Sequence, residues 1–258
     1  MRLALHAEWT KLRTLPGTGW LLLMAVAVTV GLGAAAVAGT TYADSGSDQD
    51  PVRLGLVGVQ LGQAVVAVLA VLVLGGEYAT GMIRTTLAAV PGRWTLVGAK
   101  AMIVAGAVVV PATAGVLGSL LVARLLLPGQ GFTATNGFPP LSLADGATLR
   151  AVAGSVLYLV LIALLALGIT AMVRDSAAAA GVVLGLLYLF PIVVTAVSDP
   201  DWQRHLKQAG PMTAGLSVQA TRHLDSLPIG PWAGLGVLAA WTAGALLCGG
   251  LALRLRDA

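Results

Sequence analysis

Residues 151–173 read AVAGSVLYLVLIALLALGITAMV and contain no charged side chain. A run of about 20 apolar residues is long enough to cross the hydrocarbon core of a bilayer as a helix. Arg150 precedes this run and Arg174 follows it, so the nearest charges lie where the membrane surfaces would be. The sequence therefore predicts a transmembrane helix at about 148–173.

Five further runs meet the same criterion, at about 19–39, 55–75, 97–127, 177–198 and 231–253. Of the 258 residues, 57% are hydrophobic and 10% are charged, whereas a soluble domain has about 25% charged residues. A chain this apolar cannot cover itself with polar surface in water. We therefore expect an all-α, polytopic membrane protein whose six transmembrane helices form a single domain over residues 1–258.

Two of these runs allow a second interpretation. The first follows basic residues and resembles a signal peptide, but the apolar core of a signal peptide has only about 7–15 residues. We therefore expect an uncleaved span at 19–39. The run at 97–127 is long for one span, and Pro111 in its middle permits a kink.

The Lys and Arg residues lie singly at the ends of apolar runs, which favours membrane anchoring over nucleic-acid binding. If the N-terminus is cytoplasmic, the basic residues on the cytoplasmic side are Arg2, Lys11, Arg13, Arg84, Arg93, Lys100, Arg174, Arg254 and Arg256. Those on the outer side are Arg53, Arg124, Arg150, Arg204, Lys207 and Arg222. The excess predicts that both termini are cytoplasmic and that the protein lies in the cell membrane.

Three further helices are expected outside the spans, one near the chain's N-terminus and two in the last outer connection. Leu5, Trp9 and Leu12 are spaced as the apolar face of an amphipathic helix in the cytoplasmic membrane interface; a frayed terminus is the alternative. The outer connection between spans five and six contains two helical candidates, 202–209 and 212–224.

The segment after the second span differs from its surroundings. It reads GEYATGMIRTTLAAVPGR over residues 76–93, and Lys100 follows. Residues 85–90 are expected to form a short helix that ends at Pro91 and Gly92. Arg93 and Lys100 would then mark re-entry into the membrane. A structured cytoplasmic elbow follows from these residues, and anchoring of the loop to lipid headgroups is the simpler alternative.

This segment resembles the type-2 permeases of ATP-binding-cassette exporters, especially their actinobacterial members. The resembling residues are Glu77, Gly81, Arg84, Thr85, Leu87, Pro91, Arg93, Lys100 and the N-terminal run EWTKLRT at 8–14. The six-span plan and the outer helical pair also match. Met82 departs from the pattern, because the family commonly has Thr or Ser there.

The resemblance implies a transport subunit rather than an enzyme. The elbow would hold a coupling helix that docks on a separate ATPase subunit, and a second permease copy or a paralogue would complete the transporter. ATP and magnesium would bind the ATPase, with no cofactor on this chain. The implied ATPase-coupling residues are Glu77, Tyr78, Gly81, Arg84, Thr85, Leu87, Pro91 and Arg93, and those of the interfacial helix are Glu8, Trp9, Lys11 and Arg13.

Two weaker signals concern helix packing within the bilayer. The pairs Gly58/Gly62 and Gly181/Gly185 could allow close helix approach, although such spacings arise by chance in a chain with 33 Gly. The family places spans two and five at the subunit interface. Gln60 and Gln63 share a face of span two, where they would line a substrate path or hydrogen-bond a neighbouring helix.

Other classes of function are less well supported by the residues. His6, His205 and His223 lie outside the predicted spans and none belongs to an H-E-x-x-H motif, so no metal or hydrolase site is expected. No Asp or Glu lies in the middle of a span, which disfavours an ion-coupled secondary transporter. An intramembrane enzyme, a secondary transporter and a non-transporting scaffold remain alternatives.

Overall fold

The computed structural model describes residues 2–14, 16–42, 48–89 and 92–255. Within these ranges the chain is helical and contains no strand. Six helices there are long and apolar enough to cross a membrane. They are α2 (Pro16–Ala38), α5 (Val59–Ala79), α7 (Arg93–Leu126), α8 (Gly146–Val173), the α9–α10 segment (Ser176–Thr195) and α13 (Pro231–Leu255). The α9–α10 segment consists of α9 (Ser176–Leu184), a π-helical turn (Gly185–Leu189) and α10 (Phe190–Thr195). The predicted all-α, six-span fold class is confirmed.

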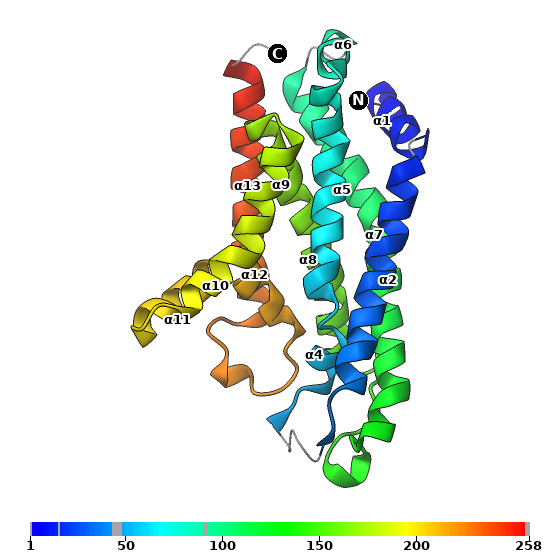
Figure 1. Cartoon of the computed structure of the whole chain (residues 1–258), viewed down its shortest axis with the longest axis vertical. Helices are drawn as coiled ribbons and strands as arrows, with labels where there is room; N and C mark the ends of the chain where they lie inside the picture. Colours follow the sequence, from blue (N-terminus) through cyan, green and yellow to red (C-terminus); the bar gives the residue numbers. More distant parts are fainter. Residues whose placement is uncertain (1, 15, 43–47, 90–91, 256–258) are drawn as a thin grey trace.

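The helices lie side by side in an elongated bundle, with both chain ends and the short helix α6 (Met82–Ala89) at one end (Figure 1). We call this the termini end. At the opposite end lie α4 (Pro51–Gly55) and residues 127–145, which include two short 3₁₀ turns, Leu127–Gln130 and Ala134–Asn136. A common end for the termini and α6 is the arrangement that the predicted topology requires.

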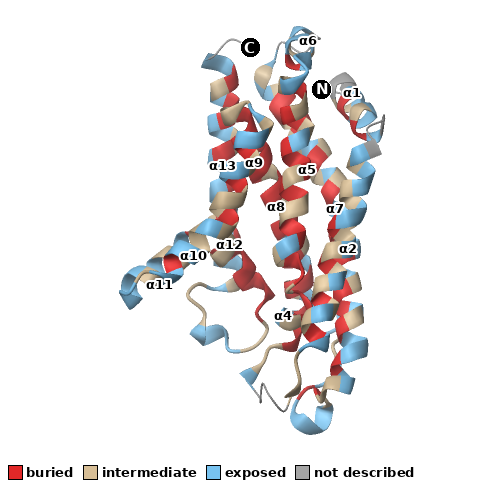
Figure 2. Cartoon of the chain, viewed as in Figure 1, coloured by how far each residue is buried: buried red, intermediate tan, exposed pale blue. Residues whose placement is uncertain are grey.

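Helix α8 forms the centre of the bundle and contacts α5, α7, α9 and α13. Tyr158, Ile162 and Leu165 on this helix are completely buried. The contact with α13 is close because Gly168 of α8 packs on the backbone at Ala245. Buried residues concentrate between the helices, whereas the outward faces are exposed (Figure 2). Many of those exposed side chains are apolar, for example Leu125 and Leu251, as suits helices surrounded by lipid.

The second span lies later in the chain than the predicted 55–75. Pro51–Gly55 forms the separate helix α4, because Asp50 caps it by accepting a hydrogen bond from the backbone N–H of Arg53 at 3.2 Å. Helix α5 then runs from Val59 to Ala79 and includes Glu77. The third span begins at Arg93 and continues through Pro111 as one helix.

The glycine pair of span two packs within the chain. A Cβ at Gly58 would lie 1.8 Å from the carbonyl oxygen of Thr29 on α2, and one at Gly62 would lie 2.1 Å from the Thr29 hydroxyl. These glycines therefore let α2 and α5 cross closely. No atom lies within 4 Å of a Cβ built at Gly181 or Gly185, so that pair faces outward.

The connection before the last span contains α11 (Pro200–Ala209) and α12 (Pro211–Gly215). Figure 1 shows α10 and α11 extending sideways from the bundle, after which α12 returns to it. The prediction at 202–209 agrees with α11, but the helix predicted at 212–224 is too long. It ends at Gly215, which packs on the Tyr158 ring, and the chain continues as a 3₁₀ turn over Leu216–Gln219. A second 3₁₀ turn follows at Leu224–Ser226.

Candidate functional site

Four charged side chains from three helices meet at the termini end. Glu8 and Lys11 come from α1 (Arg2–Thr14), Glu77 from the last turn of α5, and Lys100 from the start of α7. Lys100 Nζ lies 2.7 Å from Glu8 Oε2 and 2.8 Å from Glu77 Oε1. Lys11 Nζ lies 3.1 Å from Glu8 Oε1 and 2.7 Å from Glu77 Oε1. We call these four residues the charge cluster.

The charge cluster is electrically balanced and largely buried. The residues Lys100, Glu8 and Glu77 are 2%, 4% and 5% exposed, so three of the four charges lie almost completely inside the protein. Burying a charge is costly unless it is paired, and removing one partner leaves the other uncompensated. Because each ammonium group contacts both carboxylates, α1 is held against α5 and α7 as one unit.

Lys11 is the most accessible member, with 31% of its side chain exposed. Partial burial alone would lower the pKa of Lys11, but the hydrogen bonds and charges of Glu77 and Glu8 outweigh burial and raise it above 10.5. Lys11 therefore stays protonated at neutral pH. Its ammonium group also donates to Thr86 Oγ1 on α6 at 3.3 Å, which ties the short helix to the same cluster.

One oxygen of the charge cluster has no partner among the described residues. Glu77 Oε2 is buried and makes no hydrogen bond there. A crevice of about 440 Å³ lies beside the cluster between α1, α2 and α5, and its walls include Lys11, Leu21 and Val73. The buried carboxylate therefore borders space that is apolar over most of its surface.

The turn from α5 into α6 depends on a glycine. Gly81 has φ +70°, a left-handed backbone conformation that is unfavourable for residues other than Gly, Asn and Asp. After this turn, Ile83 points into the core and Leu87 is half-buried against it. Met82, Arg84 and Thr85 are exposed. Helix α6 thus presents a solvent-facing surface while its other face is fixed to the bundle.

Two arginines tie the end of the last span to its neighbours. Arg93 at the start of α7 donates to the carbonyl oxygen of Leu253, and Arg174 at the end of α8 donates to that of Ala252 at 2.8 Å. Both carbonyls lie in the last turn of α13, where a helix lacks internal donors and favours positive charge. Arg93 is therefore an internal contact, and the prediction that it simply marks re-entry into the membrane is incomplete.

The structure brings together some of the predicted site residues and separates others. Glu8, Lys11 and Glu77 are in contact, whereas Trp9 is 50% exposed and Arg13 is exposed. The helical prediction for α1 is confirmed, but Glu8 and Leu12 form its buried side instead of Trp9.

The remaining residues of the predicted elbow lie on the bundle side or beyond the described ranges. Tyr78 is half-buried, and its hydroxyl has no hydrogen-bond partner among the described residues. Pro91 and Val90, the predicted end of the elbow helix, lie outside the described residues, and α6 itself begins at Met82 instead of Thr85.

The prediction that Lys100 simply marks re-entry into the membrane is incomplete, as it is for Arg93. The Lys100 side chain is 2% exposed because it pairs with two carboxylates inside the bundle. A signal for this was available, since a Lys that lies inside a predicted span requires a partner. Glu8 is that partner, but a pair 92 residues apart cannot be recognised from spacing.

The two glutamines of span two have different surroundings. Gln63 is fully buried; its Oε1 accepts from the Tyr158 hydroxyl, and its Nε2 lies 3.3 Å from the Met212 sulfur. This is helix-to-helix bonding, which was one of the two alternatives. Gln60 is half-buried and borders a cavity at the far end of the bundle.

Comparison with known proteins adds no assignment to this geometry. No family model matches the chain, and no curated protein matches its sequence.

Proposed function

We propose that this chain is the membrane-spanning permease subunit of an ATP-binding-cassette exporter and is driven by a separate ATPase subunit. The observation that carries the proposal is the charge cluster directly behind α6. It joins the N-terminal helix, the exposed short helix and two spans at one end of the bundle. The residues quoted for the family resemblance are concentrated at this junction.

The exposed face of α6 suits it to receive a partner. Met82, Arg84 and Thr85 offer one apolar, one cationic and one hydroxyl side chain to a groove on the ATPase. Movement of α6 would reach α5 through Gly81 and α1 through the bond between Lys11 and Thr86. The charge cluster would pass the displacement on to α7. ATP binding would in this way bias the bundle between two packings, inward-facing and outward-facing.

Nucleotide chemistry belongs to the partner in this proposal. The chain has no G-x-x-x-x-G-K-[ST] phosphate-binding loop. ATP and magnesium are therefore assigned to the ATPase, and this chain contributes the substrate path and the docking surface. In this proposal the termini end, with α6, faces the cytoplasm.

A second permease subunit, either an identical copy or a paralogue, would pack on the outward face of α5 and α9. These two helices contact each other, and Leu72 on α5 and Val182 on α9 are each about half exposed. The open glycines Gly181 and Gly185 lie on the same segment. Small residues on an exposed face allow close approach of helices within a bilayer.

The test uses the full chain co-expressed with the ATP-binding-cassette ATPase encoded nearest its gene. We expect the two proteins to purify together and to hydrolyse ATP. Arg84→Glu and Thr85→Glu should each reduce complex formation about tenfold or more, because they place negative charge on the docking face. Arg204→Glu, on an exposed residue of α11, is the matched control and should leave assembly unchanged.

Leu87→Asp is less informative, because Leu87 contacts the core and its loss would disturb the fold itself. Normal assembly and ATP hydrolysis with both α6 variants would contradict the proposal. Efflux that continues without nucleotide and follows an ion gradient would instead identify a secondary transporter. Chemical turnover by the isolated chain would identify an enzyme.

A further inference from the structure

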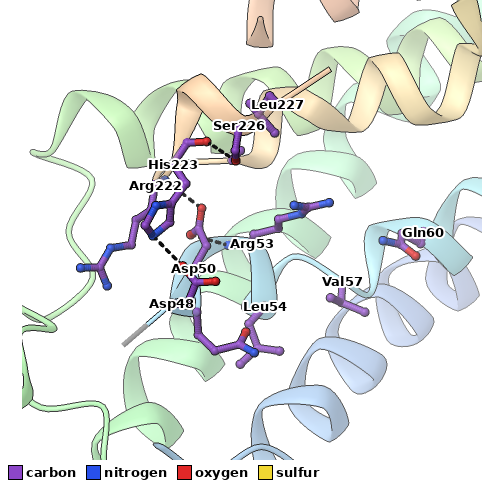
Figure 3. Close-up of a pocket in the computed structure, with 12 residues that line it drawn as sticks. Asp48, Asp50, Arg53, Leu54, Val57, Gln60, Arg222, His223, Ser226 and Leu227 are labelled. Atoms are coloured by element: carbon purple, nitrogen blue, oxygen red, sulfur yellow. Dashed lines mark hydrogen bonds and ion pairs between the residues drawn. The ribbon is translucent and has the colours of Figure 1, made fainter. Parts of the chain in front are cut away.

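A cavity of about 640 Å³ lies at the end of the bundle opposite the termini (Figure 3). Its walls come from two segments that are far apart in the sequence, residues 48–60 and residues 220–227. Binding sites for small molecules commonly enclose about 300–1,000 Å³. The cavity is therefore large enough for a ligand of modest size.

Asp50 connects the two segments by hydrogen bonds in the wall of the cavity. Its Oδ2 accepts from the backbone N–H groups of Thr221 at 2.5 Å and Arg222 at 3.1 Å. Its Oδ1 accepts from the Thr221 hydroxyl at 2.8 Å and from the backbone N–H of Arg53 at 3.2 Å. Both carboxylate oxygens therefore accept hydrogen bonds from the protein, and Asp50 joins the two segments that line the cavity.

Three other polar or charged side chains near the wall, those of Asp48, Arg222 and His223, also have partners within the protein. His223 Nε2 lies 3.1 Å from Asp48 Oδ1, and the Arg222 guanidinium lies over the Phe138 ring at 4.6 Å from its centre. His223 itself has φ +52°, a strained conformation that the loop around it must hold in place.

Arg53 and Gln60 differ from these residues. Figure 3 shows their side chains extending into the same space, from α4 and α5. Neither the Arg53 guanidinium nor the Gln60 amide makes a hydrogen bond or ion pair with any residue that the structure describes. Two donor groups thus face a cavity whose remaining surface includes the apolar side chains of Leu54, Val57 and Leu227.

These groups define the chemistry of a ligand. The planar guanidinium fork of Arg53 matches the two oxygens of a carboxylate, and the Gln60 amide can donate a further hydrogen bond. Asp48 and Asp50 lie in the same wall and disfavour negative charge in the cavity, so we expect the cavity to accept a single negative charge that pairs directly with Arg53. The apolar side chains would cover a short hydrocarbon body.

We propose that this cavity binds a small amphipathic monocarboxylate, with Arg53 and Gln60 holding the carboxylate. The site lies at the opposite end from the charge cluster and α6. It goes beyond the proposed transport function and does not depend on it, because binding here requires neither ATP nor an ATPase.

The first experiment uses the purified full chain in detergent with 4-phenylbutyrate as the probe. Phenylglyoxal modifies arginine side chains, and mass spectrometry reports each site. We expect 4-phenylbutyrate to slow modification of Arg53 at least fivefold and saturably, without protecting exposed Arg204. Failure to protect Arg53, or equal protection of both arginines, would overturn the proposal.

The second experiment measures 4-phenylbutyrate binding to variants by calorimetry. Arg53→Gln should weaken binding at least tenfold, while Arg204→Gln should leave it unchanged. Arg53→Gln keeps the backbone N–H that bonds Asp50, so the wall is preserved. Equal affinity of Arg53→Gln and the unmodified chain would contradict the assignment. Equal binding of 4-phenylbutanol would show a purely apolar cavity, and tighter binding of 4-phenylbutyl phosphate would refute the preference for a single charge.

Discussion

Lys100 on α7 and Glu8 on α1 form a buried ion pair, with Nζ and Oε2 2.7 Å apart. The pair fixes the N-terminal helix to the third span, and Glu77 shares the same ammonium group. An amphipathic helix on a membrane surface could shift or rotate freely. This one is held at a defined position beside α6, where a partner that moves α6 would also move α1.

Lys100→Met tests the cost of breaking the charge cluster. It leaves two buried carboxylates with Lys11 alone, so it should lower the free energy of unfolding by about 3–5 kcal/mol. Glu8→Gln combined with Lys100→Met restores charge balance and should recover at least half of that loss. Thermal or denaturant unfolding in micelles measures both, with Lys207→Met on α11 as the control. Strictly additive effects of the two changes would show that Glu8 and Lys100 do not interact.

The stability that Lys11 contributes through the charge cluster should depend on pH in the alkaline range. The pKa of Lys11 is raised above the usual 10.5 in the folded chain, so its contribution is complete below about pH 10.5 and is lost as pH rises through the higher folded value. The gap in melting temperature between the unmodified chain and Lys11→Gln should therefore be constant from pH 8 to 10 and shrink above pH 10.5. Trp9→Phe, an exposed change on the same helix, should show no such trend. A gap that narrows below pH 9 would contradict this assignment.

Gly58→Ala should separate α2 from α5. The added methyl group would lie 1.8 Å from the Thr29 carbonyl oxygen, and overpacking of this kind costs about 1–3 kcal/mol. Gly181→Ala is the matched control, since its Cβ meets nothing within 4 Å. The control should be neutral or stabilising by up to about 1 kcal/mol, because Ala favours helix. Equal losses in both variants would show that the α2–α5 crossing does not depend on Gly58.

The fold was predictable from the sequence because each span is a local property of an apolar run. The start of α5 was less predictable, since Asp50 caps a separate helix at a point where apolar residues continue. The helix predicted at 212–224 was too long for a related reason. After Gly215 the chain passes into a 3₁₀ turn, at a point where Gly215 packs on Tyr158 in a distant part of the chain.

The candidate site was predictable only in part. The elbow, Gly81 and Glu77 stand out by composition and by family resemblance. The pairing of Glu8 with Lys100 depends on how α1 docks, and nothing in the spacing of residues encodes it. The cavity at the opposite end joins residues 48–60 to residues 220–227, so its two donor side chains could not be brought together before the fold was known.

In the proposed topology α6 faces the cytoplasm, where an ATPase can bind it. The most direct test is labelling with a membrane-impermeant maleimide in a Cys248→Ser background, which removes the single native cysteine. Arg84→Cys on α6 is compared with Asp225→Cys, an exposed position in the last loop of the opposite end. Maleimide should label Asp225→Cys in intact spheroplasts, whereas Arg84→Cys should react only after permeabilisation. Labelling of Arg84→Cys in intact spheroplasts would contradict the proposed topology.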